Sequence, residues 1–286
     1  MLRPLLAVDA PSLLYRSFFA LPKSIRGTDG RPVNALLGTA NMLLQSVEDH
    51  DPRAVAICFG AEAAAYRVAL YPGYHADRPP MPPELAVQWE LAAEFLGSFG
   101  WTVLDATADG LEADDLLGAL ALAEVRAGGR ALLLTGDRDL FQCAGERVGI
   151  LYPTKDGPEL IGPAQVRERH GVDPTRIPDL IALRGDPSDG LPGAKGIGAK
   201  GAADLLGRFG DLEGVLAAAQ DETSAVTPRS RASLLADPET LRDFLNIATL
   251  RSPVLAPPPD GALDRASAAA AAERLGMLRL AGRLRR

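Results

Sequence analysis

Short apolar runs alternate with segments of helical period through the first half of the chain. The apolar runs are PLLAVD (4–9), RAVAICF (53–59), WTVLD (101–105), RALLLTGD (130–137) and RVGILYP (147–153). Between them lie segments such as 35–49 and 83–99, in which apolar residues recur every three or four positions. Repeated alternation of strand and helix predicts an α/β fold with a parallel sheet.

The pattern changes near residue 160, where the apolar runs stop. Five further segments have the helical period and are bounded by Gly or Pro: 163–171, 174–185, 199–210, 212–219 and 238–250. Pro-rich 252–261 predicts an extended connector, and Ala-rich 266–286 predicts one final helix with a basic end. We therefore expect an α/β unit at 1–162, a mostly helical region at 163–251, and a connector with a C-terminal helix at 252–286.

The composition is that of a globular protein: 286 residues, 47% hydrophobic and 23% charged. No run reaches the roughly 18 apolar residues of a membrane span, and Asp9 interrupts the first apolar run before a signal peptide can form. Cys58 and Cys143 lie far apart without a metal-binding spacing. We therefore expect a cytoplasmic protein with no membrane contact. The net charge of −7, taken alone, argues against a nucleic-acid partner.

Acidic residues follow the predicted strands. Asp9 ends the first run and Asp137 and Asp139 follow the fourth, so all three are expected at the carboxyl edge of the sheet, where open α/β sheets bind ligands. The stretch GLEADDLLGALALAE (110–124) adds Glu112, Asp114 and Asp115. Helix capping can explain any one of these three at about 0.3–1 kcal/mol. Two like charges about 4 Å apart, however, cost about 4 kcal/mol at an effective dielectric constant near 20, so the whole set predicts bound divalent cations.

A second group of candidate residues lies in RGDPSDGLPGAKGIGAKGAADLL (184–206). Asp186 and Asp189 are three positions apart, so one turn can direct both carboxylates to the same side; an ordinary Asp/Ser-rich turn is the alternative. GAKGIGAK then places glycines between two short helices, with Lys195 and Lys200 beside them. Such a turn exposes backbone N–H groups at the start of a helix, a geometry suited to phosphate.

Several motifs occur in one order along the chain: LLAVDAPSLLYRSFFAL, YRVALYPGYHADRPPMP, EADDLLGALA, LTGDRDLFQ and LRGDPSDGLPGAKGIGAKGAADLL. In combination they resemble the 5′-nuclease family, the flap endonuclease or 5′–3′ exonuclease module found at the N-terminus of bacterial DNA polymerase I and as free-standing proteins. The resemblance covers residues 4–250 and is to the stand-alone form. It implies a PIN-like α/β core with a helical arch, followed by a helix–three-turn–helix element that grips the duplex backbone.

The resemblance also implies roles for individual residues. The first metal site would take Asp9, Glu112, Asp114 and Asp115, and the second would take Asp137, Asp139, Asp186 and Asp189. The residues near the scissile phosphate or in the arch would be Arg16, Arg67, His75 and Arg78. The DNA-binding turn would comprise Gly193, Lys195, Gly196, Ile197, Gly198 and Lys200. The implied cofactors are two or more Mg²⁺ or Mn²⁺ ions, with K⁺ as a candidate at the helix–three-turn–helix.

Two positions depart from the family pattern. Gly60 stands where the family carries an aspartate of the first metal site, and Glu62 lies two residues further on. His75 stands where the arch usually has a lysine that reaches the scissile phosphate; an exposed loop histidine without a role is the alternative. Because water can replace a missing carboxylate, we expect a weakened or metal-selective nuclease. Tyr15 and Tyr74 either stack on a base or pack in the core.

The predicted function is metal-dependent hydrolysis of DNA with a 5′ end, flap or nick, by a monomer acting in repair or replication. Acids gathered at one site and neutralised by bound cations remove the objection raised by the negative net charge. Two alternatives remain: a non-catalytic branched-DNA-binding protein of the same fold, and a PIN-like ribonuclease. Preference for an RNA strand over a DNA strand of equal shape would identify the ribonuclease.

Overall fold

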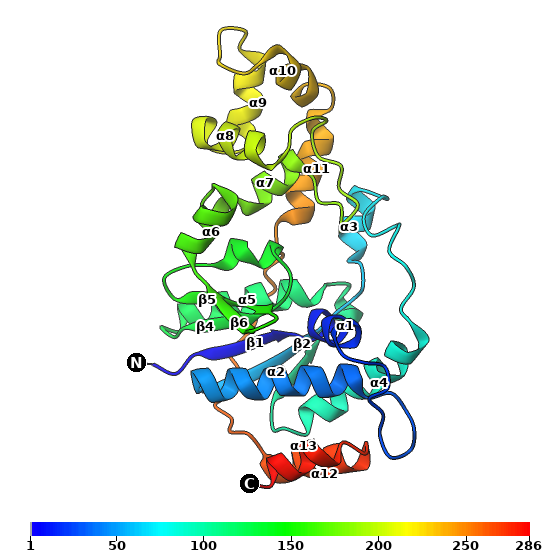
Figure 1. Cartoon of the computed structure of the whole chain (residues 1–286). Helices are drawn as coiled ribbons and strands as arrows, with labels where there is room; N and C mark the ends of the chain where they lie inside the picture. The colour runs from blue at the N-terminus through cyan, green and yellow to red at the C-terminus, as the bar shows by residue number, and fades with distance from the viewer. Residues whose placement is uncertain (1) are drawn as a thin grey trace.

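A computed structural model describes residues 2–286 around a central sheet (Figure 1). Its strands are β1 (Leu5–Asp9), β2 (Ala54–Phe59), β3 (Thr102–Asp105), β4 (Ala131–Leu134), β5 (Val148–Thr154) and β6 (Gly157–Ile161). The strand order is β3-β2-β1-β4-β5-β6. All neighbouring strands from β3 to β5 are parallel, and β6 pairs antiparallel with β5 at one edge. The prediction of an α/β fold with a parallel sheet is confirmed.

The edge strand β6 was not predicted from the sequence. Its residues, GPELI, begin with Gly and Pro and leave Leu160 half-exposed, so the stretch lacks the apolar run of a buried strand. Such residues are typical of an edge, where one side of the strand forms no ladder hydrogen bonds. The five runs that were predicted are the parallel strands, whose two faces are covered by other elements.

Helices cover both faces of the sheet. Those nearest to it are α1 (Ala10–Ala20), α2 (Asn34–His50), α4 (Pro83–Gly97) and α5 (Ala113–Arg126). Successive side chains of a strand point to opposite faces. Leu6 and Val8 of β1 therefore join the core that contains α1, α2 and α4, whereas Leu5 and Ala7 join the core that contains α5. No helix in the described part of the chain is long and apolar enough to cross a membrane.

The segment predicted as an arch connects β2 to β3. It contains the short helix α3 (Ala65–Leu70), the loop 71–82 and then α4. Loop 71–82 has no regular helix or strand, and it passes along the side of the molecule where the parallel strands end (Figure 1). The loop therefore lies beside the carboxyl edge of the sheet.

The region after β6 is helical, as predicted. It comprises α6 (Pro163–His170), α7 (Ile177–Arg184), α8 (Ala199–Phe209), α9 (Leu212–Gln220), α10 (Pro228–Leu234) and α11 (Pro238–Ala248). Leu180, Leu206 and Phe244 belong to the same buried cluster as Leu117 of α5. The helical region thus continues the core on the α5 face of the sheet, and α8 to α10 lie farthest from the strands (Figure 1).

The last segment returns to the opposite face of the sheet. Arg53 donates hydrogen bonds to the Pro258 carbonyl oxygen at 2.8 Å and to Asp260 Oδ1 at 2.7 Å, which ties the connector to the start of β2. One final helix was predicted, but the chain forms two, α12 (Arg265–Arg274) and α13 (Leu278–Leu284). The chain turns between them at Gly276, whose φ of +71° favours glycine. Both helices pack in the core that contains α2 and α4.

Candidate active site

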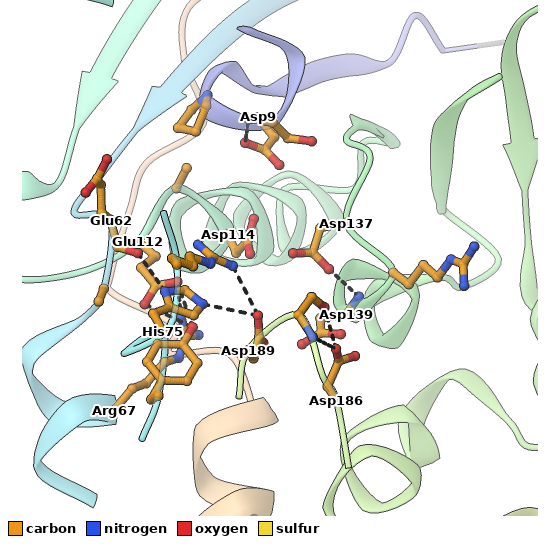
Figure 2. Close-up of a pocket in the computed structure, with 18 of the residues that line it drawn as sticks. Asp9, Glu62, Arg67, His75, Glu112, Asp114, Asp137, Asp139, Asp186 and Asp189 are labelled. Carbon is orange, nitrogen blue, oxygen red and sulfur yellow. Dashed lines mark hydrogen bonds and ion pairs between the residues drawn. The ribbon is translucent and has the colours of Figure 1, made fainter. Parts of the chain in front are cut away.

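A cavity of about 970 Å³ opens at the carboxyl ends of the parallel strands (Figure 2). Seven of the eight acids predicted as metal ligands line it: Asp9, Glu112, Asp114, Asp137, Asp139, Asp186 and Asp189. They come from the end of β1, the start of α5, the segment after β4 and the turn before α8. The fold therefore brings together acids from four separate segments of the sequence, while Asp115 lies outside the cavity lining.

Hydrogen bonds fix the acids at the ends of β1 and β4. Asp9 caps α1 by accepting from the Ser12 N–H at 3.0 Å, and its other oxygen accepts from the Thr135 hydroxyl at 2.7 Å. The Thr135 oxygen accepts in turn from the Asp137 N–H at 2.9 Å. Asp137 Oδ1 accepts from the Asp139 N–H at 2.8 Å. This chain of contacts orients the carboxylates of Asp9 and Asp137 toward the cavity.

Arg67 of α3 neutralises two of the three clustered acids. Its Nη1 lies 2.7 Å from Glu112 Oε2 and its Nη2 lies 3.2 Å from Asp115 Oδ1. Its Nε donates to the Ile247 carbonyl oxygen at 3.0 Å, and the residue is 3% exposed. Arg67, predicted to lie near the scissile phosphate or in the arch, lines the cavity, and its guanidinium joins α3, α5 and α11. This buried cation is what makes the adjacent carboxylates tolerable.

Asp115 is directed away from the cavity and caps its own helix. Its Oδ2 accepts from the Glu112 N–H at 3.2 Å, and its Oδ1 accepts from the Arg251 N–H at 2.7 Å. Glu112 lines the cavity, but its Oε1 accepts from the Ala64 N–H at 2.6 Å. The start of α5 therefore combines a capping box with an ion pair to Arg67. Of its three acids, only Asp114 has a carboxylate with no hydrogen bond or ion pair to residues 2–286.

The remaining acids repel one another in a poorly solvated space. Burial, followed by the charge of Asp137, raises the pKa of Asp114 and of Asp139 well above the usual value. Burial and the nearby charges of Asp189 and Asp9 raise the pKa of Asp137 to about 6. Raised values of this kind mean that the cavity is deficient in positive charge. A cation bound there would favour the ionised carboxylates.

The donors in the cavity suit a hard divalent cation. They are carboxylate oxygens, with no histidine or cysteine cluster, and Mg²⁺ and Mn²⁺ prefer oxygen ligands. Within residues 2–286, however, no three His, Cys, Asp or Glu side chains stand close enough to enclose an ion as they are oriented here. The cavity thus fits such an ion in charge and donor type, and the carboxylates would have to close around it.

His75 and Arg78 contact the acid Asp189. His75 Nε2 lies 3.1 Å from Asp189 Oδ1, and Arg78 Nη2 lies 3.2 Å from the same oxygen. The His75 side chain is 6% exposed and that of Arg78 is 47% exposed. The His75 side chain is therefore largely covered and forms part of the cavity wall, unlike a freely exposed loop histidine. Arg16 lies on α1 outside the cavity lining.

The two tyrosines differ in their environment. Tyr74 is buried, and its hydroxyl donates to Glu112 Oε2 at 3.1 Å, so it packs in the core. Tyr15 is partly exposed and lines the cavity together with Trp89, whose ring meets it edge-on at 6.1 Å between centroids. Tyr15 thus has an accessible face, whereas Tyr74 borders the cavity but is almost fully buried.

Gly60 lines the cavity but leaves no room for a side chain. A Cβ atom there would lie 2.5 Å from the Ala113 nitrogen and 2.7 Å from the Leu111 carbonyl oxygen, both of them backbone atoms. The next residue, Ala61, donates its N–H to that same carbonyl at 2.8 Å. Glycine thus lets the end of β2 approach the start of α5 closely. Glu62 also lines the cavity, so it is the acid nearest in sequence to the missing carboxylate.

Three residues in or beside the cavity were missed by the sequence analysis. Thr135 lies behind the lining and orients Asp9, as described above, and Arg138 and Arg184 add cations to the lining. Arg184 Nη2 lies 3.4 Å from Asp186 Oδ2, while its buried Nε has no hydrogen-bond partner in the described residues. Both arginines stand beside acids of the sequence motifs, Arg138 in TGDRDL and Arg184 in LRGD. This proximity is the sequence feature from which the two residues could have been predicted.

The glycine-rich turn between α7 and α8 has the predicted form. Gly193 and Gly196 have φ of +63° and +81°, Gly198 precedes the first turn of α8, and Ile197 is buried. Lys195 and Lys200 are exposed beside the turn. At Gly193 a Cβ would lie 2.2 Å from the Gly185 nitrogen, so the turn packs directly on the end of α7. The turn presents two cations and the start of a helix to solvent.

Two family profiles match nearly the whole chain. The 5′–3′ exonuclease N-terminal resolvase-like domain matches residues 4–171, and the 5′–3′ exonuclease C-terminal SAM fold matches residues 172–265. The chain belongs to the 5′–3′ exonuclease family. The family resemblance inferred from the sequence motifs is thereby confirmed.

Relatives of this 5′–3′ exonuclease family member include free-standing proteins and parts of larger ones. A 5′–3′ exonuclease of Streptomyces coelicolor is 38% identical over 243 residues, which cover 79% of each chain. DNA polymerase I of Mycobacterium tuberculosis is 40% identical over 215 residues, and the match spans 24% of that polymerase. The flap endonuclease of bacteriophage T5, solved with DNA and metal ions, has a TM-score of 0.72 at 18% identity, covering 99% of this chain and 98% of that chain. That structure shows a shared fold.

Proposed function

We propose that this chain is a divalent-metal-dependent 5′-nuclease that hydrolyses DNA at 5′ ends, flaps or nicks. The observation that carries the proposal is the cavity in which seven carboxylates from four segments converge. Burial and mutual repulsion raise the pKa values of Asp114 and Asp139, at the edge where open α/β sheets bind ligands, and a bound cation would offset both effects. A flap endonuclease and 5′–3′ exonucleases among the similar proteins support the same reaction.

The acids divide into two groups around the cavity. One ion would be held by Asp137, Asp139, Asp186 and Asp189, and the other would face Asp9, Asp114 and Glu112. Bound Mg²⁺ or Mn²⁺ supplies activation of a water nucleophile and stabilisation of the leaving oxygen in such sites. The chain's own contribution is to orient the carboxylates. Thr135 holds Asp9, the Asp139 N–H holds Asp137, and Arg67 holds Glu112.

DNA would contact the chain at two places. The turn at 193–200 would bind the duplex backbone through its N–H groups, Lys195 and Lys200, with K⁺ as a candidate ion there. Arg138, Arg184 and the half-exposed Arg78 would face phosphates in the cavity, because they are its accessible cations. The cavity supports a nuclease core at 1–162, and the turn at 193–200 supports a DNA-binding region at 163–251.

The experiment that tests this function is cleavage of a labelled 5′-flap DNA in Mg²⁺ or Mn²⁺. The matched variants are Asp139→Asn, which removes one cavity carboxylate, and Asp156→Asn, which removes an exposed carboxylate between β5 and β6. We expect cleavage by the unaltered chain and by Asp156→Asn, and a loss of about 100-fold or more in Asp139→Asn. Equal cleavage by all three proteins would contradict the proposal.

A non-catalytic branched-DNA-binding protein is the second candidate. Gly60 supplies no carboxylate, and Glu112 is ion-paired with Arg67. Of the acids proposed to face the same ion as Glu112, Asp9 and Asp114 then have no ion pair within residues 2–286, which favours the second candidate. Salt-sensitive binding of flap DNA without cleavage in Mg²⁺, Mn²⁺ or Co²⁺ is the result expected for this candidate. Turnover in any of these ions would exclude it.

A further inference from the structure

We infer that His75 is a positioning residue that holds the Asp189 carboxylate and its turn in place. The inference rests on the proposed function, in which Asp189 helps to hold a divalent ion. It differs from the role suggested by the family pattern, in which this position reaches the scissile phosphate. Neighbouring residues contact both the imidazole ring and the backbone of His75 (Figure 2).

Three contacts fix the ring of His75. It stacks on Tyr74, with ring centroids 3.8 Å apart and planes inclined by 20°. Its Nδ1 lies 2.8 Å from the Glu62 carbonyl oxygen, and its Nε2 lies 3.1 Å from Asp189 Oδ1. A carbonyl oxygen and a carboxylate oxygen both accept hydrogen bonds, so the two contacts require a hydrogen on each ring nitrogen, and the ring then also meets Asp189 as a cation. Both nitrogens are therefore engaged with protein atoms, and neither is available to a phosphate.

The backbone joins the same two segments. The His75 N–H donates to the Asp189 carbonyl oxygen at 3.1 Å, so main chain and side chain contact one residue far away in the sequence. A Cβ at Gly190 would lie 2.5 Å from the Gly73 carbonyl oxygen, which shows how closely loop 71–82 approaches the turn. His75 itself has φ of +56°, an uncommon value that histidine adopts more often than most other side chains. The contacts on both sides hold this conformation.

The turn that carries Asp189 is a separate closed unit. Asp186 and Leu191 exchange two backbone hydrogen bonds, each of 2.8 Å, and Asp186 Oδ1 accepts from the Ser188 N–H at 2.9 Å. Besides His75, only the exposed guanidinium of Arg78 contacts the Asp189 carboxylate within residues 2–286. The His75 side chain is thus the covered contact that sets where this carboxylate points, and it links loop 71–82 to the turn between α7 and α8.

The test is a double-mutant cycle on Mn²⁺ affinity, measured by calorimetry on the full chain. The variants are His75→Asn, Asp189→Asn and the double variant; asparagine suits the positive φ at position 75 but cannot span both partners. We expect His75→Asn to weaken Mn²⁺ binding about 10-fold, as loss of a ligand's supporting hydrogen bond does. We expect the double variant to bind no more weakly than Asp189→Asn alone.

Two controls separate positioning from general damage. His50→Asn changes a histidine at the end of α2, outside the cavity, and should leave Mn²⁺ affinity unchanged. His75→Gln is the second substitution at the site, in case the asparagine variant fails to fold, and it should weaken Mn²⁺ binding as well. On flap DNA, either His75 variant should lower kcat while KM stays within about 2-fold, since DNA contacts are unchanged.

The possible outcomes distinguish this inference from the nuclease proposal. Unchanged Mn²⁺ affinity in both His75 variants, or losses that add fully in the double variant, would overturn the inference while flap cleavage by the unaltered chain could still stand. Coupled losses of affinity in a chain that cuts no DNA would support the inference and overturn the nuclease. Absence of Mn²⁺ binding by the unaltered chain would overturn both.

Discussion

Arg67 Nη1 lies 2.7 Å from Glu112 Oε2 at a buried junction of α3, α5 and α11. The same guanidinium contacts Asp115 and a carbonyl oxygen of α11, so one side chain neutralises two acids and links three helices. The carboxylate cluster at the start of α5 therefore serves two purposes. Asp115 holds the fold together, while Asp114 stays available to a ligand in the cavity.

Replacing Arg67 should be strongly destabilising. Arg67→Met leaves Glu112 and Asp115 buried without their cation, and breaking a buried pair in this way costs about 3–5 kcal/mol. The matched control is Arg78→Met, whose half-exposed ion pair is worth about 1 kcal/mol or less. Urea unfolding measures both free energies. Equal stabilities of the two variants would show that Arg67 does not hold the junction.

Gly60→Asp should damage the fold and should not improve catalysis. Gly60 stands where the family pattern has an aspartate, but a Cβ at this position would lie 2.5 Å from a backbone nitrogen of α5. Overpacking of this kind costs about 1–3 kcal/mol. Gly207→Ala is the control, because its Cβ would meet no atom within 4 Å and alanine favours helix α8. Thermal melts and flap cleavage check both. Higher activity in Gly60→Asp would contradict the geometry.

The metal-free chain should lose stability as the pH rises from about 4 to about 6 because of Asp137. Burial and neighbouring carboxylates raise the pKa of Asp137 from 3.8 to about 6, so in this window the folded chain binds its proton more tightly than the unfolded chain does. The unfolding free energy therefore falls with increasing pH. Relative to Asp137→Asn, the unaltered chain in EDTA should become progressively less stable between pH 4 and pH 7. If the difference in unfolding free energy between the two proteins stayed constant over this pH range, the raised pKa of Asp137 would not be the cause.

The C-terminal helix pair should contribute measurably to stability. Leu284 is buried on the face of the sheet that contains α2 and α4, so Leu284→Ala should cost about 2–5 kcal/mol. Leu278 lies on the same helix but is 56% exposed, so Leu278→Ala should change stability by about 0.5 kcal/mol or less. Chemical denaturation of the full chain measures the free energy of unfolding of both variants. Similar costs at the two positions would mean that α13 does not pack as described.

The sequence predicted the features that depend on local pattern and failed where a partner distant in sequence decides the outcome. Apolar runs predicted the parallel strands, and acids at strand ends predicted the cavity, because strand direction alone places Asp9 and Asp137 at one edge. Nothing local distinguishes Asp114 from Asp115. They separate because α5 turns one toward the cavity and the other toward Arg67 and Arg251. Gly60 looked like a missing ligand, since the closeness of α5 appears only in the fold.

The most direct measurement is the location of Mn²⁺ by anomalous X-ray scattering from crystals of the full chain soaked with that ion. If these carboxylates hold the ions, we expect at least one strong peak inside the cavity, within coordination distance of Asp139 and its neighbours Asp137 and Asp186. We further expect this peak to disappear in Asp139→Asn. Manganese bound only outside the cavity, or a cavity peak unaffected by that substitution, would contradict the claim that these carboxylates hold the catalytic ions.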